Sequence, residues 1–116
     1  MANKFKPGIP DNFSFDVIRL FETYGFCGEG EGGDYVMGGR VRIDGDMPVT
    51  TDGGLMSYSH AMIPQAMQRV IAGTLQLQGR AVNQVTHKRV QNILVENFGG
   101  GALFTHQMII SSEPAS

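Results

Sequence analysis

The chain has 116 residues, 41% of them hydrophobic, and a formal net charge of −2 at pH 7. This length suits one domain with a modest core, and the 9 basic residues are scattered, which excludes the basic stripe typical of nucleic-acid binding. No apolar run approaches the roughly 20 residues of a membrane span, and the amino terminus lacks the apolar core of a signal peptide. We therefore expect a cytoplasmic protein with no membrane span and no nucleic-acid partner.

The amino-terminal segment and the first helix divide near Asp11. Residues 1–10 contain two prolines and a glycine, a composition typical of an extended lead-in. From Asp11 to Gly25, apolar residues recur at helical spacing between a capping Asp or Asn and a terminating glycine, which predicts a helix. Residues 11–116 form the predicted domain.

A glycine-rich stretch follows the first helix. Half of residues 25–34 are glycine, so this stretch is predicted to be a shaped loop. The loop contains a GxGxxG pattern, but it follows a helix instead of a strand, and its acidic residues would repel a pyrophosphate. We interpret it as a surface loop rather than a dinucleotide site. Residues 35–39 and 40–46 then predict a short pair of extended segments with glycine turns.

The second half of the chain predicts a helix followed by a hairpin. Pro64 suits a first helical turn, and apolar residues recur at helical spacing until Gly79 ends the run; these are Ile63, Met67, Val70, Ile71 and Leu75. Residues 89–98 and 102–111 are β-prone and are joined by three glycines, which predicts two neighbouring strands. The order of elements predicts an α/β fold with helices packed on a mixed sheet. Each element has one apolar face that needs a further layer to cover it.

The cysteine and histidine residues argue against a metal site. Cys27 is the only cysteine, which excludes an internal disulfide and a cysteine cluster, and its acidic neighbours should raise the pKa of its thiol. His60, His87 and His106 lie far apart in the sequence and form no HExxH motif. We expect solvation for His87 and strand packing for His106, and no metal.

His60 lies between a glycine pair and the second predicted helix. From the residues alone, His60 is either a helix-entry residue bonded to backbone or a catalyst. Gly53 and Gly54 permit a ligand to approach the backbone closely, and a histidine near a helix amino terminus favours its neutral form, which can act as a base. The triple glycine is a second candidate, because exposed N–H groups on such a backbone can hold an oxyanion; its alternative is a tight turn.

Four motifs in order resemble the carboxyl-terminal part of thiolase-like enzymes: YGFCGEGEGGDYV, MPVTTDGGLMSYSHA, LQLQGRAVNQV and VENFGGGALFTHQMII. The chain is most similar to the lipid-transfer-protein branch, which includes thiolases acting on sterol-derived acyl-CoAs and steroid side-chain aldolases. The likeness runs from about Asp11 to Ser111 and implies a thiolase-like layered fold of which this chain is the carboxyl-terminal portion.

The resemblance implies roles for individual residues. His60 matches the family histidine that activates the nucleophilic cysteine and stabilises the thioester oxyanion. Gly99 matches the glycine whose N–H forms a further oxyanion hole, while Asn97 occupies the position of the family's acid/base cysteine. The resemblance implies a coenzyme A thioester as substrate with no tightly bound cofactor, and we expect Gly53, Gly54 and Gly100 to contact it.

The departures from the family pattern bear on the reaction. The NEAF or HDCF element aligns with residues 10–13, which lack its asparagine and cysteine, and Met62, Ile63 and Pro64 replace small residues after the histidine. Both routes to a second thiol are therefore absent. The family's nucleophilic cysteine belongs to an amino-terminal half, so His60 is expected to act with groups from another polypeptide.

Two functional hypotheses remain open. The chain is either an enzyme component that makes or breaks a carbon–carbon bond in an acyl-CoA, or a non-catalytic acyl-CoA-binding or interaction subunit. As a component, it is a natural split subunit or the product of a truncated reading frame. The expected partners are a thiolase amino-terminal half or related subunit, acyl-CoA, and a second copy of the chain in a homo-oligomer. Loss of the second thiol favours retro-aldol cleavage or an altered condensation over thiolysis, because thiolysis requires an acid/base to activate the incoming coenzyme A.

Overall fold

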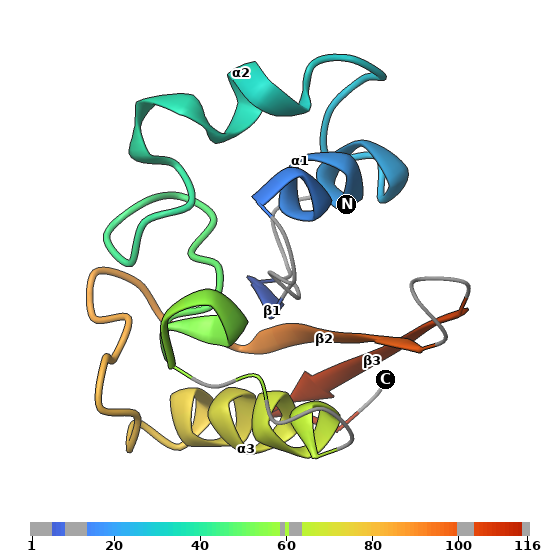
Figure 1. Cartoon of the computed structure of the whole chain (residues 1–116). Coiled ribbons are helices and arrows are strands. Elements are labelled where there is room, and N and C mark those ends of the chain that lie inside the picture. Colours follow the sequence, from blue (N-terminus) through green and yellow to red (C-terminus); the bar gives the residue numbers. More distant parts are fainter. Residues whose placement is uncertain (1–5, 9–13, 59, 61–63, 100–103, 115–116) are drawn as a thin grey trace.

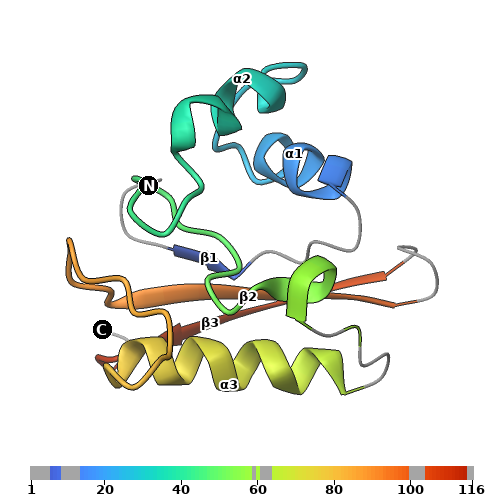
Figure 2. The ribbon, with the colours of Figure 1, turned by 60° about the vertical axis from the view of Figure 1, so that its left-hand side comes forward.

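The fold was analysed in a computed structural model, which describes residues 6–8, 14–58, 60, 64–99 and 104–114. Helices cover both faces of a small sheet: α1 and α2 lie on one side of it and α3 lies on the other (Figures 1 and 2). The elements in chain order are β1 (Lys6–Gly8), α1 (Ser14–Thr23), α2 (Gly32–Val36), a 3₁₀ turn (Met37–Gly39), a π turn (Gly54–Tyr58), α3 (Gln65–Leu77), β2 (Asn92–Gly99) and β3 (Phe104–Ser111).

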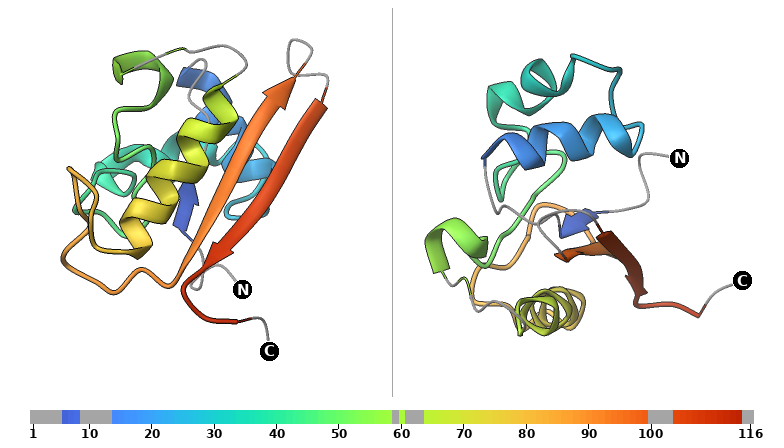
Figure 3. Two further views of the ribbon diagram at one scale, coloured as in Figure 1. Left: turned by 90° about the horizontal axis from the view of Figure 1, so that it is seen from below. Right: turned by 45° about the vertical axis from the view of Figure 1, so that its right-hand side comes forward.

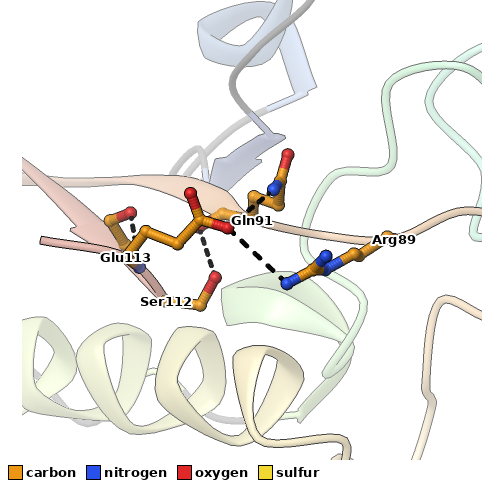
Figure 4. Close-up of polar contacts among 5 residues, drawn as sticks. Arg89, Gln91, Ser112 and Glu113 are labelled. Atoms are coloured by element: carbon orange, nitrogen blue, oxygen red, sulfur yellow. Dashed lines mark hydrogen bonds and ion pairs between the residues drawn. The ribbon is translucent and has the colours of Figure 1, made fainter.

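The sheet has three strands in the order β1-β2-β3. β1 pairs with β2 in parallel, and β2 pairs with β3 in antiparallel register, with Val95 opposite Met108 and Asn97 opposite His106. The predicted α/β class, the mixed sheet and the carboxyl-terminal hairpin are confirmed. At the end of the hairpin away from its tip, Gln91 Nε2 donates to Glu113 Oε1 at 3.0 Å and the Ser112 Oγ donates to the Gln91 carbonyl at 3.4 Å (Figure 4).

Helix α3 packs on β2 through an unexpected face. Its buried residues are Gln65, Arg69, Gly73 and Gln76, which recur at helical spacing. An added Cβ at Gly73 would lie 3.4 Å from Ile93 Cγ2 and 3.5 Å from Ile110 Cδ1, so the glycine brings the helix close to the sheet. The predicted helix is confirmed, but part of the apolar stripe that predicted it faces outward: Met67 is 61% exposed and Ile71 is 52% exposed.

The opposite side of the sheet carries the core cluster, which is built around Leu20, Phe21 and Met47. The ring of Phe21 is fully buried and lies 4.9 Å from the ring of Tyr35 and 5.7 Å from that of Phe26, centroid to centroid. These aromatic contacts fix α1 against α2 and the chain between them. This cluster therefore supplies the hydrophobic burial that anchors the amino-terminal layer.

Two predictions about local structure are wrong. Residues 35–46 do not form an extended pair: the glycine-rich stretch ends in α2 and the 3₁₀ turn, where Gly38 and Gly39 have φ of 73° and 81°, values that an extended strand does not use. Regular structure also begins before Asp11, at β1. β1 is defined by pairing with β2 some 85 residues later, for example Pro7 with Leu94, and local composition does not report such a contact.

Among the described residues, no helix is both long enough and apolar enough to cross a bilayer.

Candidate functional site

The start of α3 and the carboxyl end of β2 are joined by a side-chain hydrogen bond. Gln65 Nε2 donates to Asn97 Oδ1 at 3.2 Å; Gln65 is buried and Asn97 is half-buried. Seen from below, the π turn, the start of α3, the end of β2 and the start of β3 lie at the same end of the molecule (Figure 3, left). Asn97 and the start of α3 therefore lie in direct contact at this end of the fold.

The segment that leads to His60 is sharply bent. Thr50, Gly53 and Gly54 have φ of 44°, 97° and 59°, and Thr50 is the one non-glycine residue with positive φ in the described part of the chain. A positive φ is a strained backbone conformation for a β-branched residue such as Thr50. The Gly54 N–H donates to Asp52 Oδ1 at 3.2 Å, so this amide is held by the chain itself. A ligand contact at Gly53 or Gly54 stays a prediction.

Helix α3 holds this bent segment in place. Gln76 Nε2 donates to Thr51 Oγ1 at 2.8 Å, and Gln68 Nε2 lies 3.5 Å from Asp52 Oδ2. The π turn then begins at Gly54. Gln68 and Gln76 of α3 thus hold the segment that leads to His60.

His60 itself is exposed and follows the π turn. Gln65 is five positions further along the chain, so the Cα atoms of His60 and Gln65 lie within about 18 Å of each other. His60 is therefore near Gln65 along the chain, but the structure gives no contact between His60 and Asn97. Met62 and Ile63 lie outside the described residues.

The two glycine positions after Asn97 differ in what the structure describes. Gly99 is the last residue of β2 and stands opposite Phe104, and an added Cβ would meet only Phe104 Cβ, at 3.9 Å. No close contact therefore requires a glycine at position 99. Gly100 lies outside the described residues, so its proposed contact with a thioester stays a prediction.

An open groove of about 900 Å³ runs along the outward side of α3. Its apolar wall contains Met67, Ile71 and Leu75 of α3, and its other walls contain Tyr58 and Val82. Tyr58 is 71% exposed and Val82 is fully exposed. Contiguous exposed apolar side chains of this kind mark binding surfaces.

A buried acidic residue lies on the other face of β2. Glu96 is fully buried, and burial raises the pKa of its carboxyl, while the Tyr24 hydroxyl, Arg69 and Arg19 act in the opposite direction. Burial together with Glu96 also raises the pKa of Tyr24. The Tyr24 hydroxyl lowers the pKa of Glu96, yet neither carboxylate oxygen has a hydrogen bond of standard length among the described residues. The neutral form of Glu96 is therefore favoured relative to an exposed carboxyl.

The thiol of Cys27 is electrostatically disfavoured as a nucleophile. Desolvation, then the charges of Glu22 and Glu31, raise its pKa. The predicted direction is confirmed, although burial is the leading cause and Glu22, a helix residue, is one of the charges. Within the part of the chain that the structure describes, no group of three or more His, Cys, Asp or Glu side chains could hold a metal ion.

Comparison with known proteins identifies the family. A sequence profile described as Thiolase C-terminal domain-like matches residues 8–112. The chain belongs to this thiolase family. The predicted resemblance to the carboxyl-terminal part of thiolase-like proteins is confirmed.

Individual relatives agree with this thiolase assignment. The chain is 35% identical over 86 residues to 17-hydroxy-3-oxo-4-pregnene-20-carboxyl-CoA lyase of Mycobacterium tuberculosis, covering 73% of this chain and 21% of that protein. It is 36% identical over 89 residues to the steroid side-chain-cleaving aldolase of Thermomonospora curvata, covering 73% and 20% respectively. It is 37% identical over 73 residues to acetyl-CoA acetyltransferase of Methanothermobacter thermautotrophicus, covering 63% and 19%.

A solved structure supports the thiolase-like fold. The Ltp2-ChsH2(DUF35) aldolase superposes with a TM-score of 0.77 at 27% identity, covering 93% of this chain and 26% of that chain. This chain spans about a fifth of the length of the curated relatives it matches.

Three residues of this end of the molecule were not predicted as site residues. Gln65 and Asp52 support Asn97 and the bent segment, and His106 stands directly opposite Asn97 in the hairpin. A hairpin register built from the triple glycine could have found His106, because directly opposed residues of antiparallel strands share a face. No local signal indicates the contact of Gln65 with a strand 32 residues away.

Proposed function

We propose that the chain is a component of a thiolase-like enzyme that forms or cleaves a carbon–carbon bond in an acyl-CoA, and that a partner chain completes its site. Membership of the thiolase family supports this proposal, as do relatives named as a CoA lyase, an aldolase and an acetyltransferase. The substrate is a coenzyme A thioester, and no tightly bound cofactor is required.

The observation that carries the proposal is an open site beside an open apolar groove. His60 is exposed, the Gln65–Asn97 contact and Gly99 lie at the same end of the fold, and the groove along α3 runs from there. In the proposed complex, His60 activates a nucleophile of the partner or holds the thioester oxyanion, and the Gly99 N–H is a second donor to that oxyanion. The partner covers the groove and supplies the remaining groups.

Asn97 favours cleavage of the retro-aldol type over thiolysis. A carboxamide donates and accepts hydrogen bonds but does not exchange a proton near neutral pH, whereas thiolysis requires a group that deprotonates the incoming thiol. Retro-aldol cleavage has no incoming thiol. The acyl group and the direction of reaction follow from the partner and are not specified by these residues.

The test is reconstitution with an amino-terminal thiolase-like chain. The two chains are co-expressed, copurified and assayed for cleavage of β-hydroxybutyryl-CoA and acetoacetyl-CoA. We expect His60→Ala to lower kcat by about 100-fold with little change in acyl-CoA affinity, because the lost interaction belongs to the transition state. Gly99→Pro should also reduce the rate, since proline has no N–H.

A remote histidine provides the matched control for this experiment. His87 Nε2 lies 3.1 Å from the Gly45 carbonyl and does not line the α3 groove, so His87→Ala should leave kcat unchanged. Each variant requires a melting curve, which separates lost chemistry from lost folding. Near-full activity of a folded His60→Ala complex would refute the catalytic assignment.

The same Asn97 supports a second candidate function, a non-catalytic acyl-CoA-binding or interaction subunit, or a truncated thiolase fragment without activity. In that case the fold is retained after the acid/base group has been lost. A copurified complex that binds acetoacetyl-CoA but does not cleave either thioester would favour the binding subunit. A chain that neither copurifies with the partner nor binds the thioester would favour the fragment.

A further inference from the structure

A second histidine lies beside Asn97 on the face of the sheet that α3 covers. His106 is the residue of β3 directly opposite Asn97 of β2. Ile110 lies four residues further along β3 and approaches Gly73 of α3, so its face is the one that α3 covers. Side chains alternate along a strand, and His106 therefore shares the face of Ile110. Directly opposed residues in an antiparallel pair have Cβ atoms about 4.5–5.5 Å apart.

The contact with Gln65 determines which end of the Asn97 amide is available. Gln65 Nε2 can only donate, so the atom of Asn97 that it binds, Oδ1, is the acceptor. The Nδ2 group of Asn97, with its two N–H bonds, is then directed away from Gln65. Among the described residues no bond to Nδ2 is recorded, and this group can donate to a ligand.

The surroundings of this pair contain little charge. Arg69 is the one charged residue of α3, and it is buried. Glu96 is the one charged residue of β2, and as the neighbour of Asn97 along the strand it lies on the opposite face. His106 is the one titratable residue of β3 and is exposed. An imidazole that is accessible to a ligand thus stands next to an oriented amide donor.

We propose that His106 is the proton-transferring residue of this site, acting on a β-hydroxyacyl-CoA whose thioester oxygen is bound by Asn97 Nδ2. This inference rests on the proposed function and names the substrate class. Gln65 is a positioning residue, because it acts through Asn97. His106 supplies the proton exchange that a carboxamide at position 97 cannot provide.

The cleavage step requires no further reactant. His106 takes the proton of the β-hydroxyl group while the Cα–Cβ bond breaks, and the Cβ–O bond becomes a carbonyl. The electron pair of the broken bond moves to Cα and into the thioester carbonyl, where Asn97 Nδ2 donates to the developing oxyanion. The proton carried by His106 returns to Cα. The products are an aldehyde or ketone and a shortened acyl-CoA, so atoms and electrons balance.

The kinetic test uses the complex of the full chain with its thiolase-like partner and β-hydroxybutyryl-CoA as substrate. His106→Gln should lower kcat by about 100-fold while KM changes by less than about twofold. Added imidazole should restore part of the rate of His106→Ala, which a purely structural role would not allow. Thr105→Gln is the matched control, since Thr105 is exposed and is the preceding residue of β3, on the opposite face, and it should retain the wild-type rate.

A second measurement tests the geometry without activity. In the full chain alone, nuclear Overhauser contacts should connect the ring protons of His106 with the side-chain amide protons of Asn97; their absence would overturn the placement. A folded His106→Gln complex with wild-type kcat would overturn the role of His106 and leave the proposed function intact. A wild-type complex that neither binds nor cleaves the thioesters would refute the proposed function, and the role of His106 with it.

Discussion

Gly73→Ala tests the close packing that sets Gln65 against Asn97. The new methyl group would lie 3.4 Å from Ile93 Cγ2, and 3.5 Å from both Ile110 Cδ1 and Val95 Cγ2, which is ordinary van der Waals contact. Replacing a mid-helix glycine by alanine contributes about 1 kcal/mol through backbone propensity, and burial of the methyl group contributes up to about 0.8 kcal/mol. Since small shifts offset part of the second contribution, we expect a net stabilisation of about 1 kcal/mol.

The assay is equilibrium unfolding in urea, supported by thermal melting. For a chain of this length, about 1 kcal/mol corresponds to a rise in Tm of roughly 4 °C. Gly73→Val is the contrasting variant: its larger, branched side chain has no space between α3 and β2 and should destabilise the chain by about 1–3 kcal/mol. A destabilised Gly73→Ala would contradict the space for one methyl group at this position, and a Gly73→Val as stable as wild type would refute the close approach of α3 to the sheet.

Glu96→Gln should raise the free energy of unfolding at pH 8 by about 1 kcal/mol and change it little at pH 4. Burial raises the folded pKa of Glu96 above the ordinary value of 4.5, so the stability that this carboxyl contributes is present below that pH and is lost as the pH rises through the folded pKa. A loss of stability at pH 8 would instead indicate that ion pairing with Arg69 dominates. Cys27 should react with iodoacetamide at pH 7.5 more slowly than free cysteine, because burial and nearby carboxylates raise its pKa; faster reaction would show an activated thiol. The wild-type chain should bind a hydrophobic dye and associate at tens of micromolar, and Ile71→Lys in the α3 groove should reduce dye binding by roughly half; a monomer without dye binding would contradict an open groove.

The sequence predicts the elements whose signals are local. The periodicity after Pro64 predicts α3, and the β-prone runs around the triple glycine predict the hairpin. The same periodicity does not identify the buried side of α3. Apolar residues at helical spacing indicate a face that packs against another element. Here the face with Gln65, Arg69 and Gly73 packs on the sheet, while Met67 and Ile71 stay exposed.

Motifs indicate the candidate site residues, whereas the residues around them depend on strand pairing. His60, Asn97 and Gly99 are indicated by the family resemblance, and the structure places the Asn97 end of β2 against the start of α3. The positions of β1 and His106 depend on strand register, which the turn geometry and distant contacts determine. The segment 35–46 was misassigned because its alternating residues resemble strands, whereas the positive φ of Gly38 and Gly39 turns the chain.

The most direct test of the central claim compares the purified full chain, its thiolase-like partner and the copurified complex in one assay of β-hydroxybutyryl-CoA cleavage. We expect no turnover by the chain alone, because its candidate site is open to water and lacks the groups that the partner supplies, and measurable turnover by the complex that is lost in His60→Ala. Robust cleavage by the 116-residue chain alone would contradict the account, as would a stable complex that binds the thioester and leaves it intact.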